Sequence, residues 1–488
     1  MPVPAVRIRA VNQREARPGG AFVLYWMIGS RRLSANFALQ HAVESARTWG
    51  KPLVILEALR CDYPWASDRL HHFVIDGMAD HATALTGTPV AYYPYVEPGR
   101  GAAKGLLSSL ASHACLVVTD DFPAFFLPRM VAAAGRALDV RLDAVDANGL
   151  LPMRGTEKVF LTAFNFRQYL QGTFREALAQ WVEPIAFDDL PRASLPADVV
   201  SRWPPTPIDD LRNPQPWLSD LPIDHSVGAV DTPGGRVSAE RTLRRFVDQR
   251  LSRYVEDHSH PDADVTSGLS PYLHFGHIGA HEVFDAVVTA ERWTSRKLGT
   301  GRKGQREGWW GASPNAEAFL DQLITWRELG YNMCALQPDD YDAFDSLPAW
   351  ARATLDAHSI DTRATLYTRD QFMAAETHDH VWNAAQRQLA ATGTCHNYLR
   401  MLWGKKILEW TSSADEALET MVDIMNRLSL DGRNPNSYTG YCWTLGRYDR
   451  PWAPERPIFG TIRYMSSDNT VRKLKMKKYL ATWGRALF

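Results

Sequence analysis

The sequence predicts two domains of different class: an open α/β domain with a doubly wound parallel sheet, followed by an all-helical domain. The 488 residues exceed the roughly 250–300 that a single hydrophobic core usually serves. In the first half, short apolar runs alternate with helix-length spacers, which is the pattern of repeated βαβ units. From Val237 onward, apolar residues recur at helical spacing instead. We therefore expect domains at 1–180 and 237–488, joined by an interdomain linker at 181–236.

The strands of the first domain are expected where apolar runs follow turn residues. The run 21–27 is continuous and follows Pro-Gly-Gly, as expected for a strand buried on both faces. No GxGxxG motif follows it, so the dinucleotide-binding fingerprint is absent. Prolines recur through the proposed linker and exclude long helices there. The other expected strands are 52–56, 89–93, 115–119 and 140–145.

Composition narrows the class of protein. Hydrophobic residues make up 45% and charged residues 22%, which is ordinary for a globular protein. The net charge is -1, so any binding of nucleic acid must rely on a local basic patch. The five cysteines form no CxxC pair, which argues against a zinc site or a disulfide framework. With no signal peptide and no run long enough to span a membrane, we expect a cytoplasmic monomer without a metal.

One loop of the second half has the features of a phosphate site. Gly268 and Pro271 break the chain, and Ser267 and Ser270 are placed to cap the helix that follows. Free amides at a helix N-terminus bind phosphate readily. From spacing alone, a plain capped turn is the simpler interpretation.

The segment 430–466 carries the strongest functional signal. It is dense in Asp, Asn, Arg, Trp and Tyr, and such a segment usually wraps a large aromatic ligand or a nucleic acid. It resembles the C-terminal signature of class II cyclobutane pyrimidine dimer photolyases, within the photolyase/cryptochrome flavoproteins. The SxLSPYLHFGxI motif at 267–278 is similar to the segment with which photolyases grip the FAD phosphates. The resemblance covers 244–479 and, more loosely, the first domain.

The resemblance implies FAD as the cofactor, bound by the helical domain. Arg400 and Asp431 look like the ion pair beside the isoalloxazine ring, and a buried Arg needs such a partner. In that family the first domain can hold a second, antenna chromophore; the sequence identifies none and leaves an empty domain as the alternative. The other FAD contacts that the resemblance implies are Tyr254, Ser267, Gly268, Leu269, Ser270, Asn332, Asn383 and Asn436.

Three tryptophans form a second constellation. Trp403 and Trp410 are seven residues apart, so they lie two turns apart on one helix face. Trp382 lies on a preceding segment. Indoles at helical spacing are usually core residues, but these positions match those of the tryptophan chain that relays electrons from the surface to the flavin in class II photolyases. The resemblance therefore implies a photoreduction chain.

On the substrate side, the resemblance holds at some positions and breaks at others. Trp326 and Trp443 match the aromatic pair on which a flipped base stacks, and Met401 matches a further substrate contact. Gln322 replaces a family Glu, and an amide donates a hydrogen bond but does not supply a proton at ordinary pH. Met425 replaces the Asn that faces flavin N5. A further replacement is His258-Ser259 for a family Arg-Asn pair near the lesion.

Three functions remain open at this stage. The first is light-driven repair of pyrimidine dimers in DNA, the reaction of the family, for which two basic segments at 296–306 and 463–478 could hold phosphates. The second is a repurposed flavoenzyme that acts on a small aromatic substrate, which the substitutions at Gln322, Met425 and His258 favour. The third is a cryptochrome-like blue-light photoreceptor.

Overall fold

The computed structural model describes residues 2–484, and its chain divides into two compact units. Among those residues, no helix is long and apolar enough to cross a membrane. Both units are discontinuous in sequence. The first comprises Met1–Glu157, Thr173–Arg244 and Leu269–Ala286, and the second comprises Lys158–Gly172, Arg245–Gly268 and Val287–Phe488.

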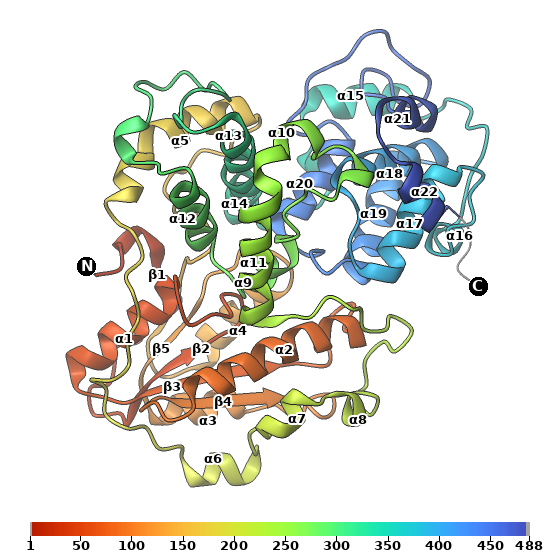
Figure 1. Ribbon diagram of the computed structural model, residues 1–488. Coiled ribbons are helices and arrows are strands. Elements are labelled where there is room, and N and C mark those ends of the chain that lie inside the picture. The colour runs from red at the N-terminus through yellow and green to blue at the C-terminus, as the bar shows by residue number, and fades with distance from the viewer. Residues whose placement is uncertain (1, 485–488) are drawn as a thin grey trace. The chain divides into compact units, whose positions relative to one another are not determined.

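A six-stranded sheet with the order β1-β6-β5-β2-β3-β4 lies at the centre of the first unit (Figure 1). Strands β2 to β6 pair in parallel, as predicted. The edge strand β1 pairs antiparallel with β6 and was not predicted, because its three residues form no apolar run. The strands are β1 (Ile8–Ala10), β2 (Phe22–Trp26), β3 (Leu53–Leu59), β4 (Ala91–Val96), β5 (Ala114–Asp120) and β6 (Leu142–Val145).

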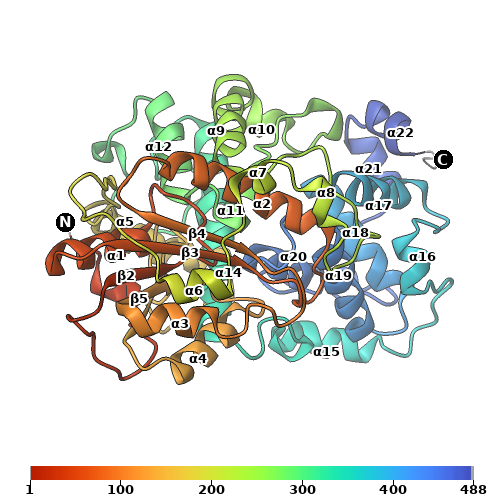
Figure 2. The same cartoon turned by 90° about the horizontal axis from the view of Figure 1, so that it is seen from below.

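Alternate residues of β2 enter two separate cores, one on each face of the sheet. Phe22, Leu24 and Trp26 belong to the core that includes residues of α3 and α4, whereas Val23 and Tyr25 belong to the core under α1. Burial on both faces explains the continuous apolar run in the sequence. Figure 2 shows these helices around the sheet from a second direction. Helices lying wholly in this unit are η1 (Ala5–Arg7), α1 (Phe37–Trp49), α2 (Asp68–Leu85), α3 (Leu106–His113), α4 (Leu127–Ala137), α6 (Ala197–Arg202), α7 (Ile208–Arg212), α8 (Gln215–Leu218) and α11 (Ser270–Phe275).

The loop that follows β2 is closed by a buried carboxylate. Asp120, at the end of β5, accepts hydrogen bonds from the amides of Ile28, Gly29 and Ser30 at 2.8, 2.7 and 3.0 Å. The Tyr25 hydroxyl donates a further bond to it at 2.7 Å. In dinucleotide-binding folds the amides of this loop hold a phosphate. Here they hold a side chain of the protein itself, which agrees with the missing glycine motif.

The proline-rich segment packs against the first unit. Val199 and Trp203 are buried in the core shared with α3, and the Trp203 indole donates to the Ala102 carbonyl at 2.9 Å. The segment Thr173–Arg244 therefore groups with the α/β unit. The boundaries at 180 and 237 stay a prediction. The contacts group the residues between them with the α/β unit.

The second unit is helical throughout its named elements. The helix expected after Val237 is irregular, because the π-helical segment η2 (Phe246–Arg250) and the 3-10 turn η3 (Leu251–Arg253) follow α9 (Gly235–Arg245). The division between units falls within α5 (Ala163–Leu178), α9 and α12 (Ala280–Ala290). The remaining elements are α10 (Tyr254–Asp257), η4 (Pro261–Ala263), η5 (Ser295–Lys297), α13 (Pro314–Leu320), η6 (Asp321–Trp326), α14 (Arg327–Leu336), η7 (Phe344–Ser346), α15 (Ala349–Ala357), α16 (Arg369–Met373), α17 (His380–Thr392), α18 (Asn397–Trp410), α19 (Ala414–Leu428), α20 (Pro435–Thr444), α21 (Ser467–Lys473) and α22 (Lys477–Trp483).

The predicted serine cap was wrong. Helix α11 begins at Ser270 itself, and Leu269 occupies the N-cap position without a side-chain capping bond. Gly268 has a φ of 70°, a left-handed conformation that glycine adopts without strain. The helix therefore starts two residues after the glycine, with Leu269 and not a serine at the N-cap.

Candidate functional site

A cavity of about 610 Å³ lies wholly among residues of the second unit. Its volume is within the range of roughly 300–1,000 Å³ that small-molecule and cofactor sites occupy. It brings together side chains from seven separate parts of the chain. The predicted site residues on its wall are His258, Gln322, Trp326, Arg400, Met401, Asn436 and Trp443.

Gln322 and Trp326 reach the cavity from a π-helical turn. In η6 the amide of Arg327 donates to the carbonyl of Gln322, which lies five residues earlier. Such wide turns occur mostly as short interruptions of α-helices and often at functional sites. Both side chains are half-buried on the cavity wall. The Gln322 amide can donate and accept hydrogen bonds there, but it holds no titrating proton.

Two arginines of the cavity wall converge on one buried carboxylate. Arg167 donates to both oxygens of Asp321 at 2.7 and 2.9 Å, and Arg306 lies 3.8 Å from the same carboxylate. Asp321 is 2% exposed, so this pair fixes the wall beside Gln322. Sequence reasoning placed Arg306 in a basic segment and missed Arg167, because 154 residues separate Arg167 from its partner.

Trp443 is surrounded by cations. The Lys405 ammonium lies 5.0 Å from its ring centroid, and the Arg463 guanidinium lies 5.5 Å away. Arg463 also lies 4.0 Å from the ring centroid of Trp452 and donates to Asp449 at 2.8 Å. Indole faces attract cations because of their negative quadrupole. An Arg and two indoles thus form one continuous surface, which no local sequence pattern predicts.

A second cavity of about 600 Å³ lies beside the first and shares its wall. Tyr398, Met401, Trp443 and Arg463 line both cavities. Among the described residues, no acidic side chain lines the second one. A cationic, aromatic surface of this kind suits phosphate and base stacking. Its cationic side chains are Arg456, Arg463, Arg472 and Lys473.

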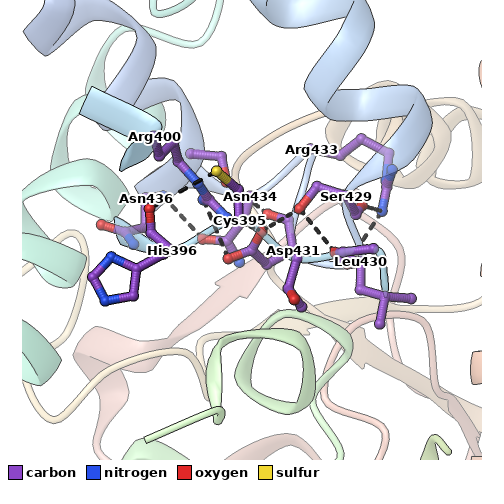
Figure 3. Close-up of polar contacts among 12 residues, drawn as sticks. Cys395, His396, Arg400, Ser429, Leu430, Asp431, Arg433, Asn434 and Asn436 are labelled. Atoms are coloured by element: carbon purple, nitrogen blue, oxygen red, sulfur yellow. Dashed lines mark hydrogen bonds and ion pairs between the residues drawn. The ribbon is translucent and has the colours of Figure 1, made fainter. Parts of the chain in front are cut away.

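Arg400 and Asp431 form the predicted ion pair, which Figure 3 shows between α18 and the loop before α20. Two guanidinium nitrogens lie 3.0 and 3.3 Å from the carboxylate oxygens, and the Ser429 hydroxyl donates to the same carboxylate at 2.6 Å. Burial lowers the pKa of Arg400, but the attraction of Asp431 outweighs burial and holds that pKa above its ordinary value. The Nε atom of Arg400 is buried and has no hydrogen-bond partner in the part of the chain that the structure describes.

The three predicted tryptophans are in contact with one another. Trp382, on α17, stacks on Trp403 with centroids 6.1 Å apart and planes at 8°, and lies 6.1 Å from Trp410. The Trp382 indole donates to the Trp403 carbonyl at 3.0 Å. All three are buried, with exposures of 0%, 1% and 3% for Trp382, Trp403 and Trp410. The order of contact is therefore Trp403, Trp382, Trp410, and none of them is open to solvent.

Two further residues extend this row toward the surface. The Tyr367 ring lies 5.6 Å from Trp410, and its hydroxyl is 2.7 Å from the Nδ1 atom of His378. Tyr367 is half-buried and His378 is exposed. Sequence reasoning missed both, although the family-like segment containing Trp382 also contains His378. Only the fold brings the extended loop of Tyr367 beside the end of α18.

Several predicted site residues do not line the cavity. Tyr254 is buried and stacks on His258 with centroids 4.9 Å apart, and burial raises its pKa to about 12. Met425 is fully buried in α19. Of the predicted phosphate segment, Ser267 and Gly268 belong to the second unit and Leu269 and Ser270 to the first.

The two other predicted asparagines serve local structure. The Asn332 amide donates to the carbonyl of Lys158 at 3.1 Å and accepts from the amide of Phe160 at 3.2 Å. The Asn383 amide exchanges hydrogen bonds with Thr377. The five cysteines are free and buried, and no group of three or more metal-binding side chains occurs among residues 2–484.

Comparison with known proteins places the chain in a family. No protein-family model matches the chain. The chain is 32% identical over 482 residues to a deoxyribodipyrimidine photo-lyase of Methanothermobacter thermautotrophicus, covering 98% of each protein. It is also 32% identical to the photo-lyase of Oryza sativa subsp. japonica, covering 97% of this chain and 90% of that protein. A class III photolyase from Agrobacterium tumefaciens shares the fold, with 20% identity, a TM-score of 0.61 and coverage of 95% and 86%.

A cryptochrome of Synechocystis also shares the fold, with a TM-score of 0.62, 13% identity and coverage of 95% and 88%. The fold of an α/β unit and a helical unit is thus shared with a photolyase and a cryptochrome. The chain belongs to the deoxyribodipyrimidine photo-lyase family. The predicted fold class is confirmed.

Proposed function

We propose that this chain is a class II cyclobutane pyrimidine dimer photolyase that binds FAD and acts on damaged DNA under blue light. The observation that carries the proposal is the cavity of about 610 Å³ whose lining includes Trp326, Trp443, Gln322 and Arg400. Aromatic side chains suited to stacking a substrate and a cationic side chain suited to a cofactor thus line one cavity, which supports the proposal. The names of the curated relatives support the same reaction.

FAD, which the family implies, supplies a light-excited electron donor when bound. The residues fit such a group, because the buried Nε atom of Arg400 has no hydrogen-bond partner among residues 2–484 and Arg400 lines the cavity. Arg400, paired with Asp431, would hold the polar edge of the ring, and Asn436, which also lines the cavity, would add a polar contact. The contacts that rest on the resemblance alone are Tyr254, Ser267, Gly268, Leu269, Ser270, Asn332 and Asn383.

The tryptophan row gives the proposed electron supply. Trp403, Trp382 and Trp410 are linked by ring separations of 6.1 Å, and their burial removes water from the path. A core role alone does not require three indoles in consecutive contact. Tyr367 would connect the row to solvent. We therefore assign the row as the path by which electrons enter the site from outside.

The proposed partner is a damaged DNA duplex, bound by a monomer. Extracting a base costs a few kcal/mol, and stacking on aromatic side chains offsets part of that cost. Trp326 and Trp443 would provide that stacking. The cations of the second cavity would hold the flanking phosphates, which gives binding that weakens steeply with salt. Gln322 would orient the substrate by hydrogen bonds and transfer no proton.

The test is the loss of a defined thymine dimer from an oligonucleotide, with FAD-loaded, reduced protein under blue light and a dark control. We expect light-dependent loss in the native chain and at least a tenfold lower yield in Trp326→Ala. The matched control is Trp217→Ala, because Trp217 lies in α8 of the first unit, outside the cavity. Equal yields from the two variants would contradict the assignment of the cavity.

A second candidate, a flavoenzyme with a small aromatic substrate, is favoured by one observation: Gln322 lines the cavity where a proton donor is expected. Photoreduction of the flavin without any loss of dimer would support that candidate over repair. A cryptochrome-like photoreceptor would give the same result, and would in addition bind neither damaged DNA nor a small substrate. An antenna chromophore in the first unit stays a prediction.

A further inference from the structure

A lysine that is completely buried lies behind the proposed substrate platform. Lys405, on α18, is 0% exposed, and its ammonium donates to the carbonyl of Thr444 at 2.6 Å. That carbonyl is at the C-terminal end of α20, where the helix dipole favours a cation. Burying an ammonium group without a paired carboxylate is costly, so such a group is rarely retained for packing alone.

The charges that face Lys405 do not neutralise it. Asp449 attracts its ammonium and Arg463 repels it, and the Asp449 carboxylate is itself paired with Arg463 at 2.8 Å. On its own helix, Lys406 points to a different partner, since it is paired with Glu409 at 2.7 Å. Burial, opposed only in part by Asp449, lowers the pKa of Lys405 to about 7.

The Lys405 ammonium lies close to a residue of the cavity wall but does not itself line either cavity. The ammonium lies 5.0 Å from the centroid of the Trp443 ring. Trp443 lines both cavities, whereas Lys405 lines neither. The indole therefore separates the ammonium from the space in which a substrate would stack. A charge in a dry environment acts through such a ring with little screening by water.

We propose that Lys405 is an electrostatic positioning residue, which holds Trp443 in place and stabilises a substrate that has accepted an electron. The inference rests on the proposed function, because it concerns a stacked substrate that becomes negative for part of the cycle. Gln322 cannot supply a proton to such a species, and a fixed positive charge behind the platform lowers its energy instead. The ammonium keeps its proton throughout, so no atom is transferred.

The expected effect follows from Coulomb's law. A unit charge about 8–9 Å from the substrate, at an effective dielectric constant near 20, changes a rate by roughly 10- to 30-fold. The stabilisation is present while Lys405 is charged and is lost as the pH rises through about 7. When Lys405 is neutral, the protein should therefore bind the substrate nearly as well but convert it less efficiently.

The experiment compares dimer loss per absorbed photon at pH 6 and pH 9 in the FAD-loaded, reduced protein. We expect the native yield to fall by roughly 10- to 30-fold from pH 6 to pH 9. Lys405→Met should be low at both values, and Lys405→Arg should be high at both, because Arg stays charged. Lys406→Met, the neighbouring paired lysine, should keep the native dependence on pH. A native yield in Lys405→Met at pH 6, or a native decline in Lys405→Arg, would overturn the inference.

A measurement without cofactor separates the two proposals. The unfolded lysine titrates near 10.4, so the native chain gains stability between about pH 7 and pH 10 as the folded lysine loses its proton first. The excess of the melting temperature of Lys405→Met over that of the native chain should therefore shrink from pH 6 to pH 9. A constant difference would refute the charge assignment whatever the repair assay gives. If the native chain removes no dimer at either pH, the proposed function fails, and the melting series alone decides whether Lys405 carries the titrating charge.

Discussion

Replacing Asp431 by Asn should destabilise the second unit strongly, because it leaves the Arg400 guanidinium buried without its counter-charge. The two bonds of the pair are 3.0 and 3.3 Å long, and the side chains are 19% and 9% exposed. Breaking a buried pair typically costs about 3–5 kcal/mol. The residual exposure of Arg400 argues for the lower end, about 3 kcal/mol. At about 2–4 °C per kcal/mol for a unit of this size, the melting temperature should fall by about 6–12 °C.

The assay is thermal and urea unfolding of the cofactor-free chain, followed by the content of FAD after reconstitution. The control is Arg369→Ala, which removes an arginine that is 44% exposed and lies 3.8 Å from both Glu419 and Asp423, whose side chains are 74% and 19% exposed. Exposed pairs contribute about 0–1 kcal/mol, so the control should shift the melting temperature little. A loss below about 1 kcal/mol in Asp431→Asn, equal to that of the control, would refute the argument that this pair is held in a buried, low-dielectric site.

Three further predictions concern electron supply and chemistry. Trp382→Phe should slow photoreduction of bound flavin by at least tenfold, because it removes the central indole of a row with ring separations of 6.1 Å. Unchanged photoreduction kinetics after a light flash would contradict the relay. Tyr367→Phe removes the hydroxyl bonded to His378 at 2.7 Å. We expect a longer-lived oxidised tryptophan signal, because electron supply from Tyr367 is lost and only slower routes remain; an unaltered decay would exclude Tyr367 from the path. Gln322→Glu combined with Met425→Asn should raise light-dependent dimer loss markedly, and no gain over the native chain would show that these positions do not limit repair.

The amino-acid sequence was sufficient to predict the main strands and helices and several residues of the site. The apolar run of β2 could be recognised because burial on both faces leaves no polar positions in it. The seven-residue spacing of Trp403 and Trp410 was enough to place them on one face of α18. The ion pair of Arg400 with Asp431 was predicted from a resemblance of separated motifs, and the structure forms it.

Other features depend on contacts between segments that are remote in sequence, and no local sequence pattern predicts such contacts. The serine cap before α11 was predicted from composition, but the backbone begins the helix at Ser270. Asp120 reaches the loop after β2 across 90 residues, and Arg167 reaches Asp321 across 154. Short-range spacing contains no information on such pairs, because they form only when the strands and helices pack.

The sequence by itself determined which residue types are present and how each segment is periodic, so it predicted the class of fold and the family. Only the tertiary structure decided the environment of each group. Lys405 is one of two adjacent lysines in the sequence, yet packing pairs Lys406 with Glu409 and leaves Lys405 buried against Trp443. Desolvation and neighbouring charges, which set the behaviour of an ionisable side chain, are properties of the assembled core and are absent from the order of residues.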